Sequence, residues 1–141
     1  MLAPLQLRKG GIIMSKSIVS IAKGDDPEKL IHEVLAPLGG VEALIQPKST
    51  VVLKPNAGHP APAETSVNTN PEVVAAVIKE VRKANPKEII VAEAAAVGCD
   101  TMESLEVSGI LKAAEDAGVD KVIDIKSDKD LLNIPIRDAR S

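Results

Sequence analysis

Short apolar runs alternate with longer stretches of helical spacing along this chain, and this alternation restricts the fold more than any other feature. Aliphatic and β-branched residues fill the runs at 16–23, 50–54, 88–92 and 121–125, which are separated by turn-forming residues. Apolar strands that alternate with amphipathic helices indicate right-handed βαβ units. The sequence therefore predicts an α/β fold with a mostly parallel sheet and helices on both of its faces, a Rossmann-like three-layer sandwich.

Helix start signals follow these runs. The clearest helix begins near Pro71. Either Asn70 caps this helix and Pro71 is its first residue, or Thr69 caps it and Glu72 completes a capping box. Ser108 is expected to cap a later helix.

Composition limits both the core and the partners. The 141 residues are 45% hydrophobic and 26% charged, which suits a soluble domain with a real core. The aromatic content is 0%, so the core is expected to be aliphatic and base-stacking platforms are missing. A net charge of −3 argues against a nucleic-acid partner. No apolar run is long enough to span a bilayer, so no membrane partner is expected.

The two ends of the chain are expected to differ in role. Residues 1–14 show no periodic pattern and are predicted to be a disordered leader or tail. Met14 is expected to be the natural start, because codons for the preceding Lys and Gly residues can resemble a bacterial ribosome-binding site. Residues 15–141 are predicted to form a single α/β domain, in which 131–136 adds one more extended segment.

Polar residues follow two of the predicted strands directly. Lys54 and Asn56 come after one strand, and Glu93 comes after the next. Ligands in α/β sheets bind outside the carboxyl ends of the strands, where these residues are expected to meet. The helix at Pro71 would add unpaired backbone N–H groups and a partial positive charge. The sequence therefore predicts a site for an anion such as a carboxylate or a phosphate.

Each of these residues also has a structural interpretation. Lys54 could be a solvated strand-end residue, and Asn56 could form an Asx turn. Glu93 could act as a general base or metal ligand, but a structural ion pair with Lys54 is favoured. The loop at 55–69 is long for a strand–helix connection, which favours a functional role. The fingerprints of Rossmann, P-loop and α/β-hydrolase sites are absent from the sequence.

Cys99 is the single cysteine, which excludes an internal disulfide and favours a reducing, cytoplasmic compartment. As a nucleophile Cys99 would need a base, and none lies near it in the sequence, so an inert thiol is favoured. His59 is expected to face solvent. The spacing of His59, Glu93, Cys99 and Asp100 matches no strong metal signature, so no metal ligand is assigned.

Two motifs resemble a known family. Residues 51–56 read VVLKPN, and residues 69–74 read TNPEVV. Together with segments around 91–93, 108–110 and 124–135, they resemble the prokaryotic family called domain of unknown function 362 (DUF362). The resemblance covers nearly all of 17–136. It implies an α/β domain and makes Lys54, Asn56, Thr69 and Glu93 the positions of interest.

Members of that family often carry ferredoxin-type cysteine clusters, which the resemblance would imply here. This chain has no such cysteines, so no iron–sulfur cluster is expected in it. It also lacks the family's later lysine–histidine and lysine–asparagine segments and is therefore expected to be the amino-terminal part of the larger domain.

Two functions remain open on the sequence alone. The first is a site for an anionic small molecule or a metal-assisted ligand, formed by Lys54, Asn56, Thr69, Asn70 and Glu93. The second is a non-catalytic binding or assembly module that pairs with another copy, another chain or a missing second half. No catalytic residue is assigned.

Overall fold

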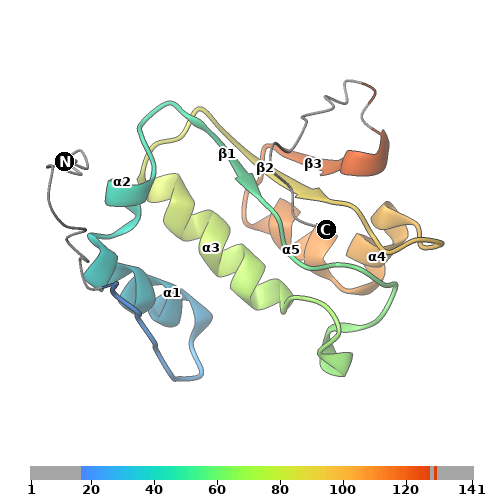
Figure 1. The fold of residues 1–141 in the computed structure, drawn as a ribbon, viewed down its shortest axis with the longest axis horizontal. Coiled ribbons are helices and arrows are strands. Elements are labelled where there is room, and N and C mark those ends of the chain that lie inside the picture. Colours follow the sequence, from blue (N-terminus) through green and yellow to red (C-terminus); the bar gives the residue numbers. More distant parts are fainter. Residues whose placement is uncertain (1–16, 128, 130–141) are drawn as a thin grey trace, which may run out of the picture.

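The structure, a computed structural model, describes residues 17–127 and 129. Figure 1 shows the arrangement of its elements. The helices are α1 (Pro27–Leu35), α2 (Val41–Leu44), α3 (Pro71–Lys83), α4 (Thr101–Val107) and α5 (Ile110–Asp116), and the strands are β1 (Thr50–Leu53), β2 (Glu88–Glu93) and β3 (Lys121–Asp124). The expectations for residues 1–14 and 131–136 lie outside the described residues.

The three strands form a parallel sheet in the order β1-β2-β3. Val51 lies opposite Ile89, and Val91 lies opposite Val122. Both the α/β class and the parallel sheet are therefore confirmed, and each of these strands ends within one residue of its predicted boundary. None of the helices within the described residues is long and apolar enough to cross a membrane.

The strand predicted at 16–23 is wrong for the residues described. Residues 17–23 have no strand structure, and Ile18, Val19 and Ile21 are 64%, 82% and 87% exposed. In Figure 1 this blue segment runs along the side of α1 that faces away from the strands. β-Branched residues favour a pleated, half-buried environment, but a strand also requires a neighbour, and this segment has none.

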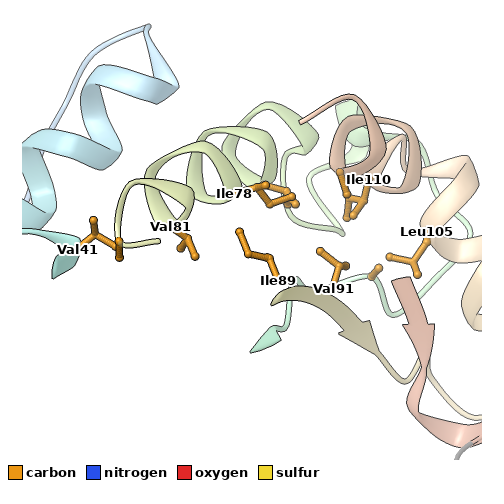
Figure 2. Packing of buried hydrophobic residues seen from close by; sticks show 11 residues of the cluster. Val41, Ile78, Val81, Ile89, Val91, Leu105 and Ile110 are labelled. Atoms are coloured by element: carbon orange, nitrogen blue, oxygen red, sulfur yellow. The ribbon is translucent and has the colours of Figure 1, made fainter. Parts of the chain in front are cut away.

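The core lies between one face of the sheet and the helices. Ile89 and Val91 of β2 point to the same face because they are two residues apart. Figure 2 shows Ile78 of α3 and Ile110 of α5 extending from their helices toward these two residues. Leu105 of α4 belongs to the same cluster, and these five side chains are fully buried. The absence of aromatic residues leaves methyl packing as the source of core stability.

The described residues form two of the three predicted layers. A right-handed crossover from β1 to β2 and another from β2 to β3 progress in the same direction, so their helices fall on the same face. Helices on both faces would require the strand order to reverse, and sequence spacing does not reveal direction. On the opposite face Val52 is 58% exposed and Ile123 is 38% exposed. Within the described residues no helix covers that face.

The helix caps test two expectations from the sequence. Asn70 caps α3, since its side-chain oxygen accepts the N–H of Glu72 at 2.7 Å. Ser108 was expected to cap α5, and this prediction is wrong. Its hydroxyl donates to the carbonyl of Leu105 at 3.1 Å at the end of α4. Gly109 precedes α5 instead, with a φ of 78° that a residue with a side chain rarely adopts.

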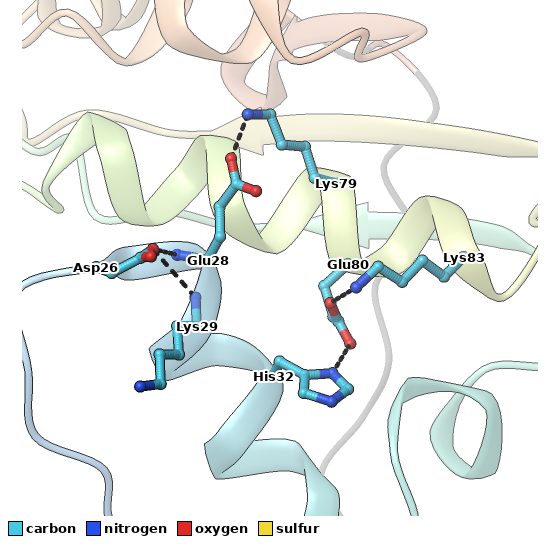
Figure 3. A network of polar contacts seen from close by, with 7 residues as sticks. All are labelled: Asp26, Glu28, Lys29, His32, Lys79, Glu80 and Lys83. Atoms are coloured by element: carbon cyan, nitrogen blue, oxygen red, sulfur yellow. Dashed lines mark hydrogen bonds and ion pairs between the residues drawn. The ribbon is translucent and has the colours of Figure 1, made fainter.

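Helix α1 docks on α3 through a buried carboxylate (Figure 3). Glu80 of α3 is only 5% exposed. Its Oε1 is 3.0 Å from Nδ1 of His32, and its Oε2 accepts from the ammonium of Lys83 at 2.5 Å. The hydrogen bond from Lys83, followed by that from His32, lowers the pKa of Glu80 below its usual value of 4.5, because these contacts outweigh desolvation.

We predict that the stabilising contribution of Glu80 is lost in acid. A carboxyl whose pKa is lower in the folded state stabilises the fold above its unfolded value, and this contribution is lost as the pH falls through the folded pKa. The melting temperature of the wild type should therefore fall progressively below about pH 4.5. Glu80→Gln should lower the melting temperature at neutral pH and flatten this acid dependence. The exposed Glu106→Gln control should do neither, and an unchanged acid limb in Glu80→Gln would contradict the assignment.

Candidate functional site

The carboxyl ends of β1 and β2 bring Lys54 and Glu93 together. Nζ of Lys54 is 2.7 Å from Oε2 of Glu93. The Glu93 side chain is 3% exposed, whereas that of Lys54 is 58% exposed. The other carboxylate oxygen of Glu93 accepts the N–H of Ala94 at 2.9 Å. Of the roles considered for Glu93, the ion pair with Lys54 is therefore formed, and both of its oxygens are engaged.

Asn56 and Thr69 fasten the two ends of the long loop after β1. The N–H of Asn56 donates to the hydroxyl of Thr69 at 2.8 Å, and the N–H of Thr69 donates to the carbonyl of Asn56 at 2.7 Å. The side-chain amide of Asn56 donates to the carbonyl of Val67 at 3.3 Å. These three bonds close the loop and hold Thr69 beside the end of β1.

The start of α3 differs from the expectation of free N–H groups. Pro71 has no N–H, and Asn70 Oδ1 accepts the N–H of Glu72. The N–H groups of Val73 and Val74 donate to the carbonyl of Asn70 at 3.1 and 3.2 Å. The first turn is therefore satisfied within the chain. Asn70 acts here as a helix cap, and only the partial charge of the helix end remains to attract an anion.

A cavity of about 280 Å³ lies between β1 and the first half of α3. Its walls are mostly aliphatic, and Lys54 and Thr69 are the two lining residues with polar side chains. It is lined by Val52, Leu53, Lys54, Pro55, Thr69, Val73, Val74 and Val77. Asn56, Asn70 and Glu93 do not line it. The structure therefore joins two of the five predicted ligand-binding residues in one cavity.

Sequence reasoning missed the apolar wall of this cavity. Val74 and Val77 belong to the helical stripe that was interpreted as core. Val74 is buried, but Val77 is only partly covered, and β1 is an edge strand beside which no further strand lies within the described residues. Knowing that β1 lies at the edge of the sheet would have revealed this wall, but the sequence does not give the order of the strands.

A second pair of groups meets at the same edge of the sheet. The Sγ of Cys99 is 3.4 Å from Nδ1 of His59, although 40 residues separate them in the sequence. The expectation that Cys99 has no base nearby is wrong. That expectation considered only residues close to Cys99 in the sequence. The loops after two neighbouring parallel strands, however, emerge side by side in space.

The described residues offer few ligands for a metal ion or an iron–sulfur cluster. In the part of the chain that the structure describes, no group of three or more His, Cys, Asp or Glu residues is arranged to hold a metal ion. The iron–sulfur clusters that the resemblance would imply need several thiolates, and Cys99 is the one cysteine of the sequence. The residues present therefore do not fit an iron–sulfur cluster.

These elements define an α/β domain with a parallel sheet and a cavity at the edge strand. The family model described as Domain of unknown function (DUF362) matches residues 51–140, well over half of the chain. The protein belongs to this family. The match begins at Val51, so residues 17–50, for which a resemblance was also expected, lie outside it. Comparison with curated proteins and with solved structures finds no match.

We predict that the Lys54–Glu93 pair is coupled energetically. Lys54→Met leaves the buried Glu93 carboxylate without its cation and should cost about 1–3 kcal/mol of unfolding free energy. The double variant Lys54→Met/Glu93→Gln should lose less than the sum of the two single variants in urea denaturation. As a control, Lys112→Met breaks an exposed pair with Asp116 and should leave the unfolding free energy nearly unchanged. Strict additivity of the two site variants would contradict the coupling.

Proposed function

We propose that this protein binds a small organic anion in the cavity between β1 and α3. The observation that supports the proposal is the lining of that cavity, in which Lys54 and Thr69 stand among aliphatic residues. Ligand pockets are typically apolar with a few polar groups that fix orientation. The volume of about 280 Å³ suits a molecule smaller than a nucleotide.

Lys54 supplies the charge for this ligand. One of its three N–H donors bonds Glu93, which leaves two that can turn toward the cavity. Glu93 fixes the position of the ammonium, since its own side chain is buried and bonded on both oxygens. The hydroxyl of Thr69 accepts from Asn56 and keeps its own hydrogen for a ligand oxygen. A carboxylate would match this pair of donors.

The ion pair also limits which anions bind well. Glu93 neutralises much of the charge of Lys54. The attraction of Lys54 for an inorganic anion therefore exceeds the hydration of that anion in water only slightly. An aliphatic chain adds about 0.8 kcal/mol for each CH₂ group buried against the valine wall. The proposal therefore favours carboxylates with an apolar body over phosphate or acetate. It concerns binding, and it assigns no reaction.

We predict that hexanoate stabilises the protein against heat, whereas acetate, phosphate and hexanol do so weakly. A ligand at tenfold excess over its Kd adds about 1.4 kcal/mol to stability, which corresponds to a rise of several degrees in melting temperature. Lys54→Met should abolish this rise relative to its own ligand-free baseline. Val73→Phe should also abolish it, because the larger side chain fills the cavity and leaves the Lys54–Glu93 pair intact.

The matched control is Lys87→Met. Lys87 is exposed and precedes β2 at the opposite end of the sheet, so its loss should leave the hexanoate response unchanged. Isothermal titration on the same four proteins measures Kd directly. Equal responses to hexanoate in the wild type and in both cavity variants would refute the site.

A second candidate function is assembly, which the edge of the sheet favours. Among the described strands β1 is hydrogen bonded to β2 alone, so its other side presents backbone donors and acceptors. Beside it lies an open groove lined in part by Leu44, Ile45, Val51 and Val52. An exposed edge flanked by apolar side chains is suited to accept an additional strand.

The occupant we infer is segment 17–23 of a second copy of this chain. Its side chains Ile18, Val19 and Ile21 are exposed and β-branched, which gives the segment both the propensity and the unburied surface of a missing strand. Addition to β1 would bury these side chains next to the groove. Two copies could exchange the segment symmetrically, as closed dimers commonly do.

We predict that the wild-type protein has twice the chain mass in light scattering at high concentration. Val19→Lys in the segment or Val52→Lys beside the edge should shift it to the monomer, because each places a charge where the strand would pack. Val97→Lys, in a fully exposed loop, is the control and should stay dimeric. A wild-type protein that remains monomeric throughout would rule out this assembly.

A further inference from the structure

The loop after β1 and the loop after β2 are fastened to each other at the carboxyl edge of the sheet. The N–H of Ala96 donates to the carbonyl of Gly58 at 2.9 Å, next to His59 in the chain. The N–H of Cys99 donates to the carbonyl of Ala96 at 3.0 Å, which forms a turn. These two bonds connect the backbone of His59 to that of Cys99 through Gly58 and Ala96, so the 3.4 Å contact of their side chains rests on a fixed frame.

Each loop is also held by side-chain hydrogen bonds. The side-chain amide of Asn68 donates to the carbonyls of His59 and Ala61 at 2.8 and 3.0 Å. The Oδ1 of Asn68 is buried without a hydrogen-bond partner among the described residues. The side chain that holds the carbonyl of His59 therefore has an unsatisfied acceptor. On the other side, the ammonium of Lys126 donates to the carbonyls of Ala96 and Cys99 at 3.2 and 3.0 Å.

The thiol is accessible to a small reagent. Cys99 is partly buried, and His59 is exposed. A Cβ atom built on Gly98 or on Gly58 would meet nothing within 4 Å, so open space borders the pair on both loops. The ammonium of Lys126 donates to the carbonyl of Cys99, and the carboxylate of the next residue, Asp100, accepts the N–H of Glu103 at 2.8 Å.

We propose that Cys99 and His59 form a reactive thiol site that undergoes exchange with low-molecular-weight disulfides. An imidazole nitrogen in contact with a thiol is the arrangement that activates cysteine nucleophiles. Exchange needs a thiolate, access and a leaving thiol, and it requires no oxyanion hole. Two ligands are too few for a stable metal site, which makes nucleophilic chemistry the better use of this pair. The site is separate from the cavity between β1 and α3, which neither residue lines.

The exchange step balances without a further reagent. Nδ1 of His59 takes the proton of the Cys99 thiol, and the thiolate attacks one sulfur of the small disulfide. A new sulfur–sulfur bond forms to Cys99 as the original one breaks, and the departing thiolate receives the proton. Cys99 is oxidised to a mixed disulfide, and the released sulfur is reduced to a thiol.

The test is the rate of reaction with 5,5′-dithiobis(2-nitrobenzoate), whose released thiolate absorbs visible light. Cys99 is the single cysteine, so the signal reports one site. At neutral pH the folded wild type should react at least about tenfold faster than the same protein unfolded in urea. His59→Gln should lower the folded rate by about tenfold or more. His32→Gln replaces the other histidine of the sequence and should leave the rate unchanged.

Two further variants separate chemistry from folding. In His59→Ala, added imidazole should restore part of the lost rate, since a free base can occupy the vacated position, whereas a structural role would not be rescued. Lys87→Met, at the opposite end of the sheet, should react like the wild type. The thiol assay uses no organic anion, so failure of the proposed anion site and failure of this one are distinguishable. Equal rates in the wild type and His59→Gln, or a folded protein no faster than the unfolded one, would overturn the proposal.

Discussion

The four residues of β1 pair with β2 in parallel register, with Val51 opposite Ile89 and Leu53 opposite Val91, and this pairing sets the position of every candidate functional group. Because the strands run in the same direction, the chain leaves both of them at one edge. The contact between Lys54 and Glu93 at that edge is a direct consequence. So is the contact between His59 and Cys99 in the loops that follow.

The same sheet leaves other surface open. All helices in the core cluster pack on the face that carries Ile89 and Val91, so the described domain buries one side of its sheet. Val52 and Ile123 remain exposed on the other side, and no other described strand pairs with the outer edge of β1. The two functions proposed for this surface use adjacent parts of it. The anion cavity lies on the helical side of β1, and the inferred strand would add along its edge.

Two buried glutamates show how the protein tolerates charge in an aliphatic interior. Glu80 and Glu93 have side chains that are 7% and 3% exposed, and each is bonded to a lysine whose own side chain is more than half exposed. A buried carboxylate is costly unless it is paired and hydrogen bonded. Exposed lysine stems let the ammonium reach inward while it keeps water contact. Glu80 uses this arrangement to dock α1, whereas Glu93 uses it to position the cation of the candidate site.

The sequence by itself determined the α/β class, the three strands from 50 to 124 and the start of α3, because these follow from local hydrophobic periodicity and from caps such as Asn70. It also identified Lys54 and Glu93 at strand ends. The unpaired state of residues 17–23, the direction in which the strands are ordered and the meeting of His59 with Cys99 were decided by the tertiary structure alone. Each of these depends on which strands are neighbours, and neighbours distant in sequence are selected by packing that no local pattern encodes.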